Sequence, residues 1–217
     1  MSDQSHFTRR TVLRGATLVG ATVVAAPTLL VTPDTATAAA SAFKTLTAAE
    51  GKLLDAIVDR LIPSDAHGPG AREAHVVHYI DRALGDALAS SRSAYASGLA
   101  ALDRYATSSR GKSFLELSSI DQDSVLIDCE TGGATGFTGS SAQFFAMILN
   151  HTRQGMFGDP FYGGNVNQVG WELIGYPGVR TFVSPDDQKM LEANKLTSNH
   201  KSAYDYRGFS QDAHHGD

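Results

Sequence analysis

The fold class of this 217-residue chain is decided by the stretch Thr47-Ala48-Ala49-Glu50-Gly51-Lys52-Leu53-Leu54-Asp55-Ala56-Ile57-Val58-Asp59-Arg60-Leu61-Ile62-Pro63. Its first four residues form a capping box, in which an N-cap threonine pairs with a glutamate three residues later. Apolar side chains then recur with the spacing of one helix face, at Leu53, Leu54, Ile57, Val58, Leu61 and Ile62. Pro63 ends the pattern because proline lacks the N–H that would continue a helix. The stretch therefore predicts an amphipathic helix.

The same criteria predict further helices downstream. They cover residues 72–88, roughly residues 91–107, residues 119–129 and a segment that starts at Ser141. The third of these opens with a second capping box, Ser119-Ile120-Asp121-Gln122, and turn-rich stretches at residues 64–70 and 132–139 separate the helices. We find no internal repeat and no confident strand. The sequence therefore predicts an all-α fold, with a single helical domain over residues 41–193.

The helical pattern stops after Gly155. Residues 155–183 are rich in glycine and large aromatic side chains and show neither a helical nor an alternating period. So much apolar surface favours a long ordered loop over a disordered one. Ser184-Pro185 then predicts a last short helix with proline at its first position. A polar tail, residues 194–217, follows, with Tyr204, Tyr206 and Phe209 interspersed.

The first 40 residues have the pattern of a twin-arginine signal peptide. Thr8-Arg9-Arg10-Thr11-Val12-Leu13-Arg14 supplies the signature, and Arg9, Arg10 and Leu13 are its defining residues. A modestly apolar run, residues 16–31, leads to two A-x-A cleavage sites, Ala36-Thr37-Ala38 and Ala38-Ala39-Ala40. An uncleaved anchor is the alternative, although this run is shorter than the ~20 residues that span a bilayer. Because the twin-arginine translocase carries folded cargo, we expect a periplasmic or otherwise extracytoplasmic protein that acquires a cofactor or a partner before export.

Charge and cysteine content exclude several classes of protein. The whole chain carries −5 and its first 40 residues contribute +1, which leaves the mature part at about −6. A mildly acidic domain without a basic run is not typical of a nucleic-acid binder or of a protein held to anionic lipid. The single cysteine, Cys129, excludes a c-type haem, an iron–sulfur cluster and an internal disulfide. Its place on a helical pattern leaves two interpretations open, a buried thiol or a bridge to another chain.

Few residues form a recognisable catalytic pattern. No Rossmann glycine motif, Walker motif or G-x-S-x-G elbow is found. His75 and His78 lie three residues apart on one predicted helix face, and His67 precedes them, so a metal site is conceivable although paired surface histidines are the simpler interpretation. Asp159 and Glu172 could form an acid–base pair. Because Asp159 precedes a proline, a turn is the favoured interpretation.

The glycine- and aromatic-rich segment is the sharpest feature. It contains Gly155-Met156-Phe157-Gly158-Asp159-Pro160-Phe161-Tyr162-Gly163-Gly164-Asn165, followed by Gly170-Trp171-Glu172-Leu173-Ile174-Gly175-Tyr176-Pro177-Gly178. Aromatic side chains between glycines give rigid contact area at a low entropic cost, which is typical of a protein–protein surface. The alternative is a loop that only closes its own domain, and the residue types alone leave both open.

Residues 46–183 resemble the gluconate 2-dehydrogenase subunit 3 family, the small subunit of exported flavin-dependent sugar and sugar-acid dehydrogenases. The most specific matches are Asp159-Pro160-Phe161-Tyr162-Gly163-Gly164-Asn165 and the stretch from Trp171 through Gly178. Supporting matches are Leu46-Thr47-Ala48-Ala49-Glu50, Asp59-Arg60-Leu61-Ile62-Pro63, Gly68-Pro69-Gly70-Ala71-Arg72-Glu73-Ala74 and Val77-His78-Tyr79-Ile80-Asp81.

The resemblance implies a helical subunit without catalytic, cofactor-binding or metal-binding residues of its own. It would pack on an FAD-dependent catalytic subunit of the glucose–methanol–choline type, which is exported as its passenger, and in some complexes a cytochrome c completes the assembly. The residues expected at the partner interface are Asp159, Pro160, Phe161, Tyr162, Gly163, Gly164, Asn165 and Trp171. The competing hypothesis is a stand-alone exported enzyme that uses His75, His78 or Asp159 with a bound metal.

Overall fold

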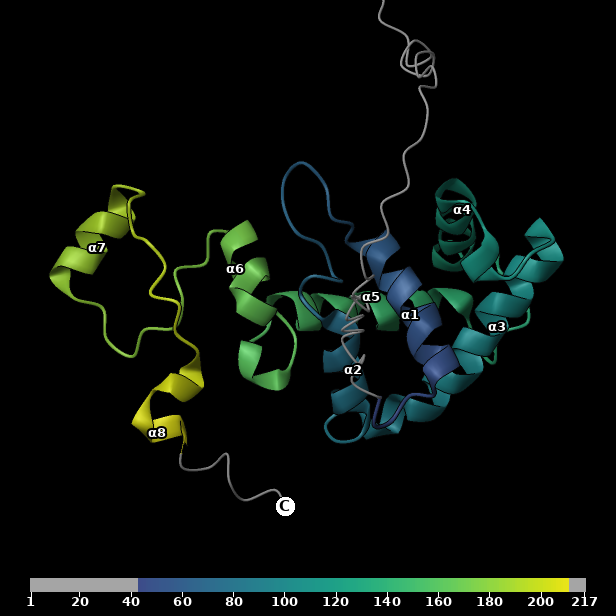
Figure 1. Cartoon of the computed structure of the whole chain (residues 1–217), viewed down its shortest axis with the longest axis horizontal. Helices are drawn as coiled ribbons and strands as arrows, with labels where there is room; N and C mark the ends of the chain where they lie inside the picture. The colour runs from purple at the N-terminus through teal and green to yellow at the C-terminus, as the bar shows by residue number, and fades with distance from the viewer. Residues whose placement is uncertain (1–42, 211–217) are drawn as a thin grey trace, which may run out of the picture. The chain divides into compact units, whose positions relative to one another are not determined.

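The computed structural model describes residues 43–210, and the predicted export signal with Arg9, Arg10 and Leu13 lies outside them. Helices account for the regular structure of these residues, which include no strand beyond an isolated bridge between Asp65 and Gly68 (Figure 1). The all-α prediction is confirmed. None of the helices between residues 43 and 210 has the length and apolar character needed to cross a membrane.

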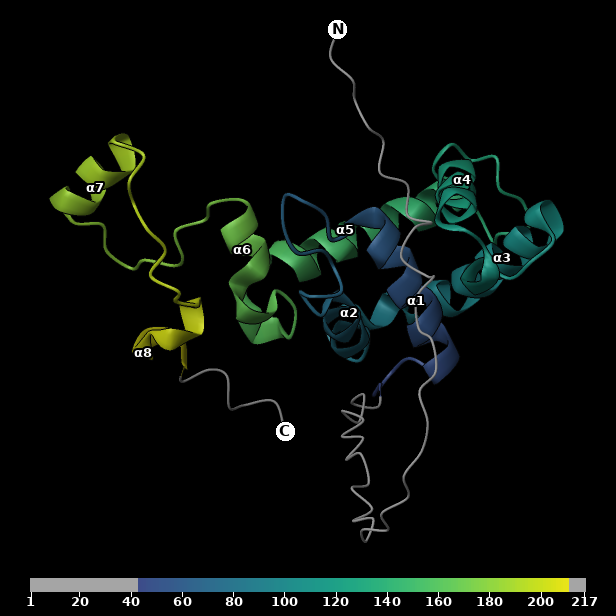
Figure 2. The same ribbon diagram turned by 45° about the horizontal axis from the view of Figure 1, so that its top comes forward.

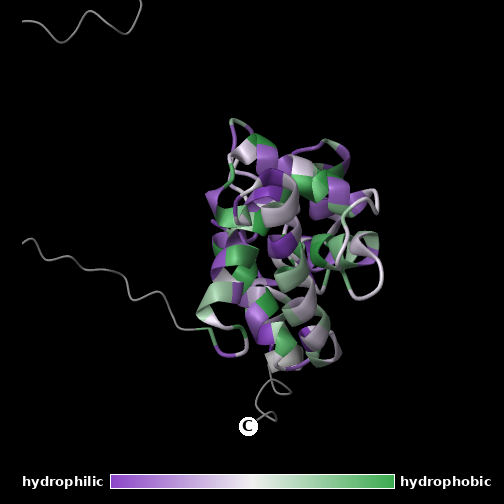
Figure 3. Ribbon diagram, turned by 90° about the vertical axis from the view of Figure 1, so that its right-hand side faces the viewer, coloured by the Kyte–Doolittle hydropathy of each residue, from purple (hydrophilic) through white to green (hydrophobic). Residues whose placement is uncertain are grey.

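The core is built by α1 (Ala48–Leu61), α2 (Val76–Leu84), α3 (Arg92–Arg110), α4 (Ser119–Glu130) and α5 (Ser141–Phe157). Helix α5 packs against α2 and α4, while α1 contacts α2, α3 and α5 (Figure 2). Apolar side chains from all of these helices fill the space between them: Leu54, Ile57, Ile80, Leu84, Leu99, Leu102, Val125 and Ile148. Figure 3 shows hydrophilic and hydrophobic residues mixed along the helices in view, as amphipathic helices around a shared core require.

Helix α1 begins as its sequence predicts. The Thr47 hydroxyl accepts a hydrogen bond from the Glu50 amide at 3.2 Å, and the Glu50 carboxylate accepts one from the Thr47 amide at 2.8 Å. Glu50 also receives two hydrogen bonds from the Arg92 guanidinium, at 3.0 and 2.8 Å. One residue therefore caps α1 and joins it to the first turn of α3.

A buried carboxylate fastens the residues just before α1 to α2. Asp81 accepts hydrogen bonds from the backbone amides of Lys44, Thr45 and Leu46, at 2.8, 2.9 and 2.7 Å. Phe43 packs on the same core. Because a buried carboxylate needs such donors, Asp81 ties the entry of the chain to the folded domain.

Two predicted helix starts are wrong in detail. Helix α2 begins at Val76 and not at residue 72, because residues 71–75 form turns and His75 has a left-handed backbone with φ 56°. It also ends at Leu84, since Gly85 caps it, and not at residue 88. Helix α4 is capped by Ser118 and not by Ser119, because the Ser118 hydroxyl accepts from the Asp121 amide at 3.2 Å.

The segment after α5 is irregular but contains short helical elements. Helix α5 continues past Gly155 to Phe157, and turns of 3₁₀ helix at Pro160–Tyr162 and Val166–Gln168 precede α6 (Val169–Leu173). The expectation that no helical period survives after Gly155 is therefore corrected. Helix α7 (Pro185–Glu192) follows, with Ser184 as its N-cap as predicted, and α8 (Arg207–Ser210) ends the described chain.

The single thiol belongs to the core. Cys129 on α4 is fully buried and unpaired, and burial raises its pKa to about 12. A protonated, enclosed thiol is inert toward exchange. Of the two interpretations of Cys129 left open by the sequence, the geometry supports the buried thiol.

A buried histidine predicts how stability depends on pH. His151 on α5 is 6 % exposed and its Nδ1 is hydrogen-bonded to the Tyr95 hydroxyl of α3 at 3.0 Å. Burial lowers the pKa of His151, so below the unfolded pKa of about 6.5 the unfolded chain binds more protons than the native one. We therefore expect the free energy of unfolding to be level above that pH and to fall as the pH is lowered through it.

Urea unfolding of the wild type and of His151→Gln at pH values from 7.5 to 5 tests this expectation. The variant cannot take up a proton at this position, so its free energy of unfolding should fall less than that of the wild type. Parallel curves for the two proteins would assign the pH dependence to other groups.

Candidate functional site

The residues expected at a partner interface lie directly after α5. Gly158 ends α5, and Asp159 turns the chain by accepting a hydrogen bond from the Phe161 amide at 3.0 Å. Pro160 at the first position fits this 3₁₀ turn, since its missing N–H is not needed there. The turn predicted for Asp159 is confirmed.

Asn165 holds the segment together from inside. It is fully buried, its side-chain amide donates to the Gly158 carbonyl at 2.9 Å, and its side-chain carbonyl accepts from the Gly170 amide at 2.8 Å. Its backbone is left-handed, with φ 47°, a conformation that asparagine tolerates better than most residues. One side chain thus replaces the backbone pairing that an irregular segment lacks.

Two glycines allow this segment to lie against the end of α5. A Cβ atom at Gly164 would collide with the Gly155 carbonyl, and one at Gly170 would collide with the Met156 carbonyl. Both obstacles are backbone atoms, which cannot rotate away. The glycines therefore serve close backbone approach within this chain.

Trp171 lies inside the subunit. Its indole is 5 % exposed, its Nε1 donates to the Phe157 carbonyl at 2.8 Å, and its ring meets the Tyr176 ring edge-on at 4.8 Å. The only tryptophan of the chain thus closes α6 onto α5. Its predicted role at a partner interface stays a prediction, and its observed contacts are with its own chain.

Phe161 and Tyr162 form an aromatic cluster with a residue of the tail. The Phe161 ring stacks on Tyr204 with centroids 3.7 Å apart, and the hydroxyls of Tyr162 and Tyr204 share a hydrogen bond of 2.7 Å. That bond raises the pKa of Tyr204. The Arg82 guanidinium of α2 lies over the Phe161 ring, 5.7 Å from its centroid, and donates to the Phe161 carbonyl at 3.1 Å. Tyr162 remains 47 % exposed, so it is the member of the cluster that can meet a partner.

The tail folds back over the same segment. Asp159 accepts from the Ser202 hydroxyl at 2.7 Å and from the Ala203 amide at 2.9 Å, in addition to the Phe161 amide. Its carboxylate is therefore occupied by three donors and is poorly suited to act as a base. Glu172, the other half of the acid–base pair considered from the sequence, lies 3.8 Å from Nδ1 of His200.

The histidines do not assemble into a metal site in the described residues. The rings of His75 and His78 lie 5.3 Å apart, but no group of three or more histidine, cysteine or carboxylate side chains in residues 43–210 is placed to hold a metal ion. The metal-dependent alternative thus receives no support from the geometry of these residues.

Exposed apolar side chains gather in the second half of the described chain. Leu115, Ile120 and Ile127 are scattered before α5. The others form what we call the apolar surface: Tyr162, Leu173, Ile174, Tyr176, Phe182, Val183, Met190 and Leu191. Of this set, Tyr162 is among the residues predicted at a partner interface, and the members beyond Gly178 are not. The sequence does contain one indication of these members, because Met190 and Leu191 are adjacent apolar residues on an otherwise polar helix.

Comparison with known proteins gives a single kind of match. The family model described as gluconate 2-dehydrogenase subunit 3 matches residues 48–178, which run from the first turn of α1 to just beyond Trp171 and Tyr176. No curated protein and no solved structure matches the chain.

Proposed function

The chain belongs to the gluconate 2-dehydrogenase subunit 3 family, and from that premise we propose that it is the small, non-catalytic subunit of an extracytoplasmic, FAD-dependent sugar or sugar-acid dehydrogenase. Membership makes it an accessory subunit of a dehydrogenase complex. In the proposal, the flavin, the catalytic base and the substrate pocket belong to a larger subunit of the glucose–methanol–choline type. This chain stabilises that subunit and carries it through twin-arginine export.

The family match carries the proposal, because it covers the helical core and the segment that the resemblance marks as most specific. The apolar surface adds independent support. Exposed large apolar side chains that gather on one part of a protein are typical of sites of association. Here they begin within the matched residues, at Tyr162, and continue past them to Leu191.

The aromatic segment serves both of the functions that its sequence left open. Asn165, Gly164 and Trp171 build the segment from within, as their burial and hydrogen bonds indicate. Exposed residues such as Tyr162 and Leu173 are then held in place for a partner, since their supporting residues are locked in one conformation. We assign partner contact to the exposed residues and scaffolding to the buried ones.

Co-purification tests the proposal directly. The subunit, tagged at its C-terminus, is expressed with the proposed flavoprotein subunit, and the tagged fraction is separated by size exclusion. We expect one complex with a flavin spectrum and sugar-dependent dye reduction. The subunit expressed alone should elute without flavin absorbance.

Two results would contradict this proposal. A stoichiometric flavin on the isolated subunit would move the cofactor into this chain. A flavoprotein that elutes separately from the tagged subunit at micromolar concentration would show that the two form no stable complex.

A further inference from the structure

Residues 180–198 form an arm. Hydrogen bonds join its two ends at the base, and the helix between them is exposed. At the base, the Val179 amide donates to the Lys201 carbonyl at 2.9 Å and the Asn199 amide donates to the Pro177 carbonyl at 3.2 Å. Arg180 adds a bond to the Thr197 carbonyl at 2.9 Å and another to the Pro177 carbonyl. These bonds fix where the arm begins and ends on the folded domain.

Within residues 43–210, helix α7 of the arm packs closely against no other helix. It is eight residues long and none of its residues is buried. In the described chain, its side-chain bonds join residues 184–192 to one another: the Ser184–Asp187 cap, the Asp186–Lys189 ion pair and the Gln188–Glu192 hydrogen bond. A helix shorter than about 12 residues is marginal in water without tertiary packing. Its stability therefore requires a surface that covers it.

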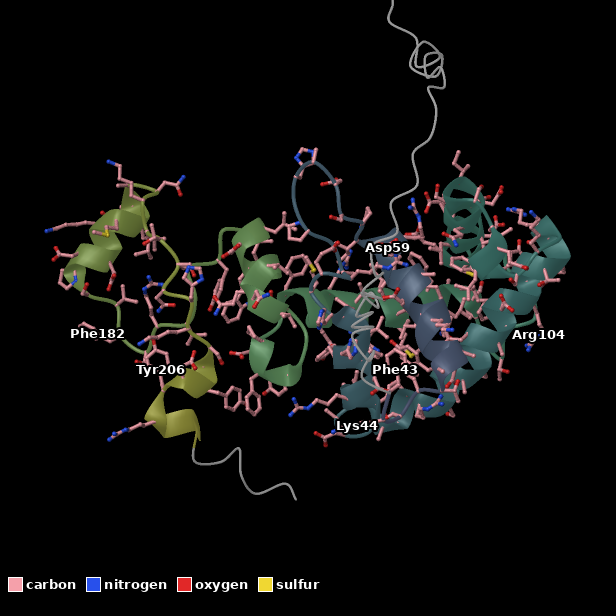
Figure 4. All side chains as sticks on the ribbon, in the orientation of Figure 1. Phe43, Lys44, Asp59, Arg104, Phe182 and Tyr206 are labelled. Atoms are coloured by element: carbon pink, nitrogen blue, oxygen red, sulfur yellow. The ribbon has the colours of Figure 1, made fainter. Side chains whose placement is uncertain are left out.

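The arm presents the side chains that such a surface would bury. Phe182 is 76 % exposed, and Met190 and Leu191 are 51 % and 58 % exposed (Figure 4 labels Phe182). Phenylalanine and methionine are enriched at the centres of interfaces, and methionine adapts to irregular grooves. An amphipathic helix laid into an apolar groove is a recurring mode of recognition.

We propose that this arm docks α7 into an apolar groove of the large flavoprotein subunit, with Phe182, Met190 and Leu191 as its anchors. The inference rests on the proposed function and names the part of the chain that holds the partner.

The charge of α7 favours a partner with a basic surface. The helix carries Asp186, Asp187 and Glu192 against Lys189, so a basic rim on the groove would complement it. A second copy of this chain fits less well, because two acidic helices on two acidic subunits would repel each other. The closed base lowers the entropic cost of docking, since the arm is already positioned.

Hydrogen exchange on the free subunit and on its complex with the co-purified flavoprotein tests the proposal. We expect the amides of residues 186–193 to exchange rapidly in the free subunit and to become at least tenfold slower in the complex. A paired binding measurement uses Met190→Asp with Leu191→Asp, and as matched control Ile120→Asp with Ile127→Asp, two exposed apolar residues of α4. The arm variant should bind at least about tenfold more weakly, as expected for interface anchors, and the control should bind like the wild type.

Four other results would overturn the inference, and each can be told apart from the rest. A stable complex with unchanged exchange in the arm and normal binding of the arm variant refutes the inference and leaves the proposed function intact. Protection of the arm in a dimer of the isolated subunit would make a second copy the occupant. Protection in the unprocessed precursor alone would make the N-terminal segment the occupant. Failure to form any complex with the flavoprotein would refute the proposed function and this inference with it.

Discussion

Replacing Trp171 by alanine should lower the free energy of unfolding of this subunit by about 3–5 kcal/mol, the usual cost of truncating a buried aromatic side chain. The indole is 5 % exposed and joins α6 to the last turn of α5. Its removal leaves a cavity beside Tyr176 and takes the donor from the Phe157 carbonyl. Urea unfolding followed by far-ultraviolet circular dichroism measures the loss as a lower midpoint.

Two control variants separate the contribution of the Trp171 ring to stability from that of its hydrogen bond. Trp171→Phe keeps most of the apolar contact but leaves the Phe157 carbonyl without its donor, so it should cost about 1–3 kcal/mol. Tyr176→Ala removes a ring that is 39 % exposed and should cost less than Trp171→Ala.

The affinity of Trp171→Ala for the flavoprotein tests whether Trp171 contacts the partner or only stabilises its own subunit. Because the indole lies inside the subunit, the folded fraction of Trp171→Ala should bind the flavoprotein within about threefold of the wild type, a difference below 1 kcal/mol. A variant that melts normally but binds at least tenfold more weakly would contradict this expectation. Trp171 would then contact the partner, as the sequence pattern suggested.

Local signals explain why most helices could be predicted from the sequence. The Thr47–Glu50 box and Ser184 with Pro185 specify helix starts within four residues, and the structure places α1 and α7 at those starts. The start of α2 was predicted too early because residues 72–75, Arg-Glu-Ala-His, contain no glycine or proline that would indicate a turn. In that turn the Ala71 amide donates to the Ile62 carbonyl at 2.8 Å, a contact that sequence periodicity does not report.

The candidate site was less predictable, because its residues are held by contacts between distant parts of the chain. Asn165 could not be identified as a buried hub, since the groups that it binds are backbone atoms of Gly158 and Gly170 and carry no side-chain signature. The tail was expected to be polar, yet it contacts Asp159 through Ser202 and the Ala203 amide. Its one usable signal was an aromatic residue in a polar stretch, Tyr204, which stacks on Phe161.

For the residues predicted at the partner interface, the exposed fraction of the side chain and the residue type point to different roles. Tryptophan and asparagine beside glycines indicate recognition when only the sequence is known, because such residues are frequent at binding surfaces. Burial, which sequence does not report, places Trp171 and Asn165 inside this subunit and leaves Tyr162 exposed, and the interface role of all three stays a prediction. Four members of the apolar surface, Phe182, Val183, Met190 and Leu191, lie beyond the matched family segment, which ends at Gly178.

Replacing Arg9 and Arg10 together by lysine should retain both this subunit and its flavoprotein in the cytoplasm. The pair lies outside the described residues, so this expectation rests on the Thr8–Arg14 signature alone. Lysine keeps the charge but not the planar, five-donor guanidinium, so a site that recognises arginine by geometry should reject it. Cell fractionation with antibodies against both subunits should find less than about a tenth of the wild-type amount of either outside.

The matched control for this change is Arg14→Lys, which keeps a basic residue at the end of the signature and should leave export intact. Each remaining outcome is informative, because the two subunits are followed separately. If this chain still reaches the outside, its export does not depend on the arginine pair. If only the flavoprotein does, it has a route of its own and is not a passenger. Retention of both, with export restored to both when the arginines are returned, would establish that one signal serves two chains.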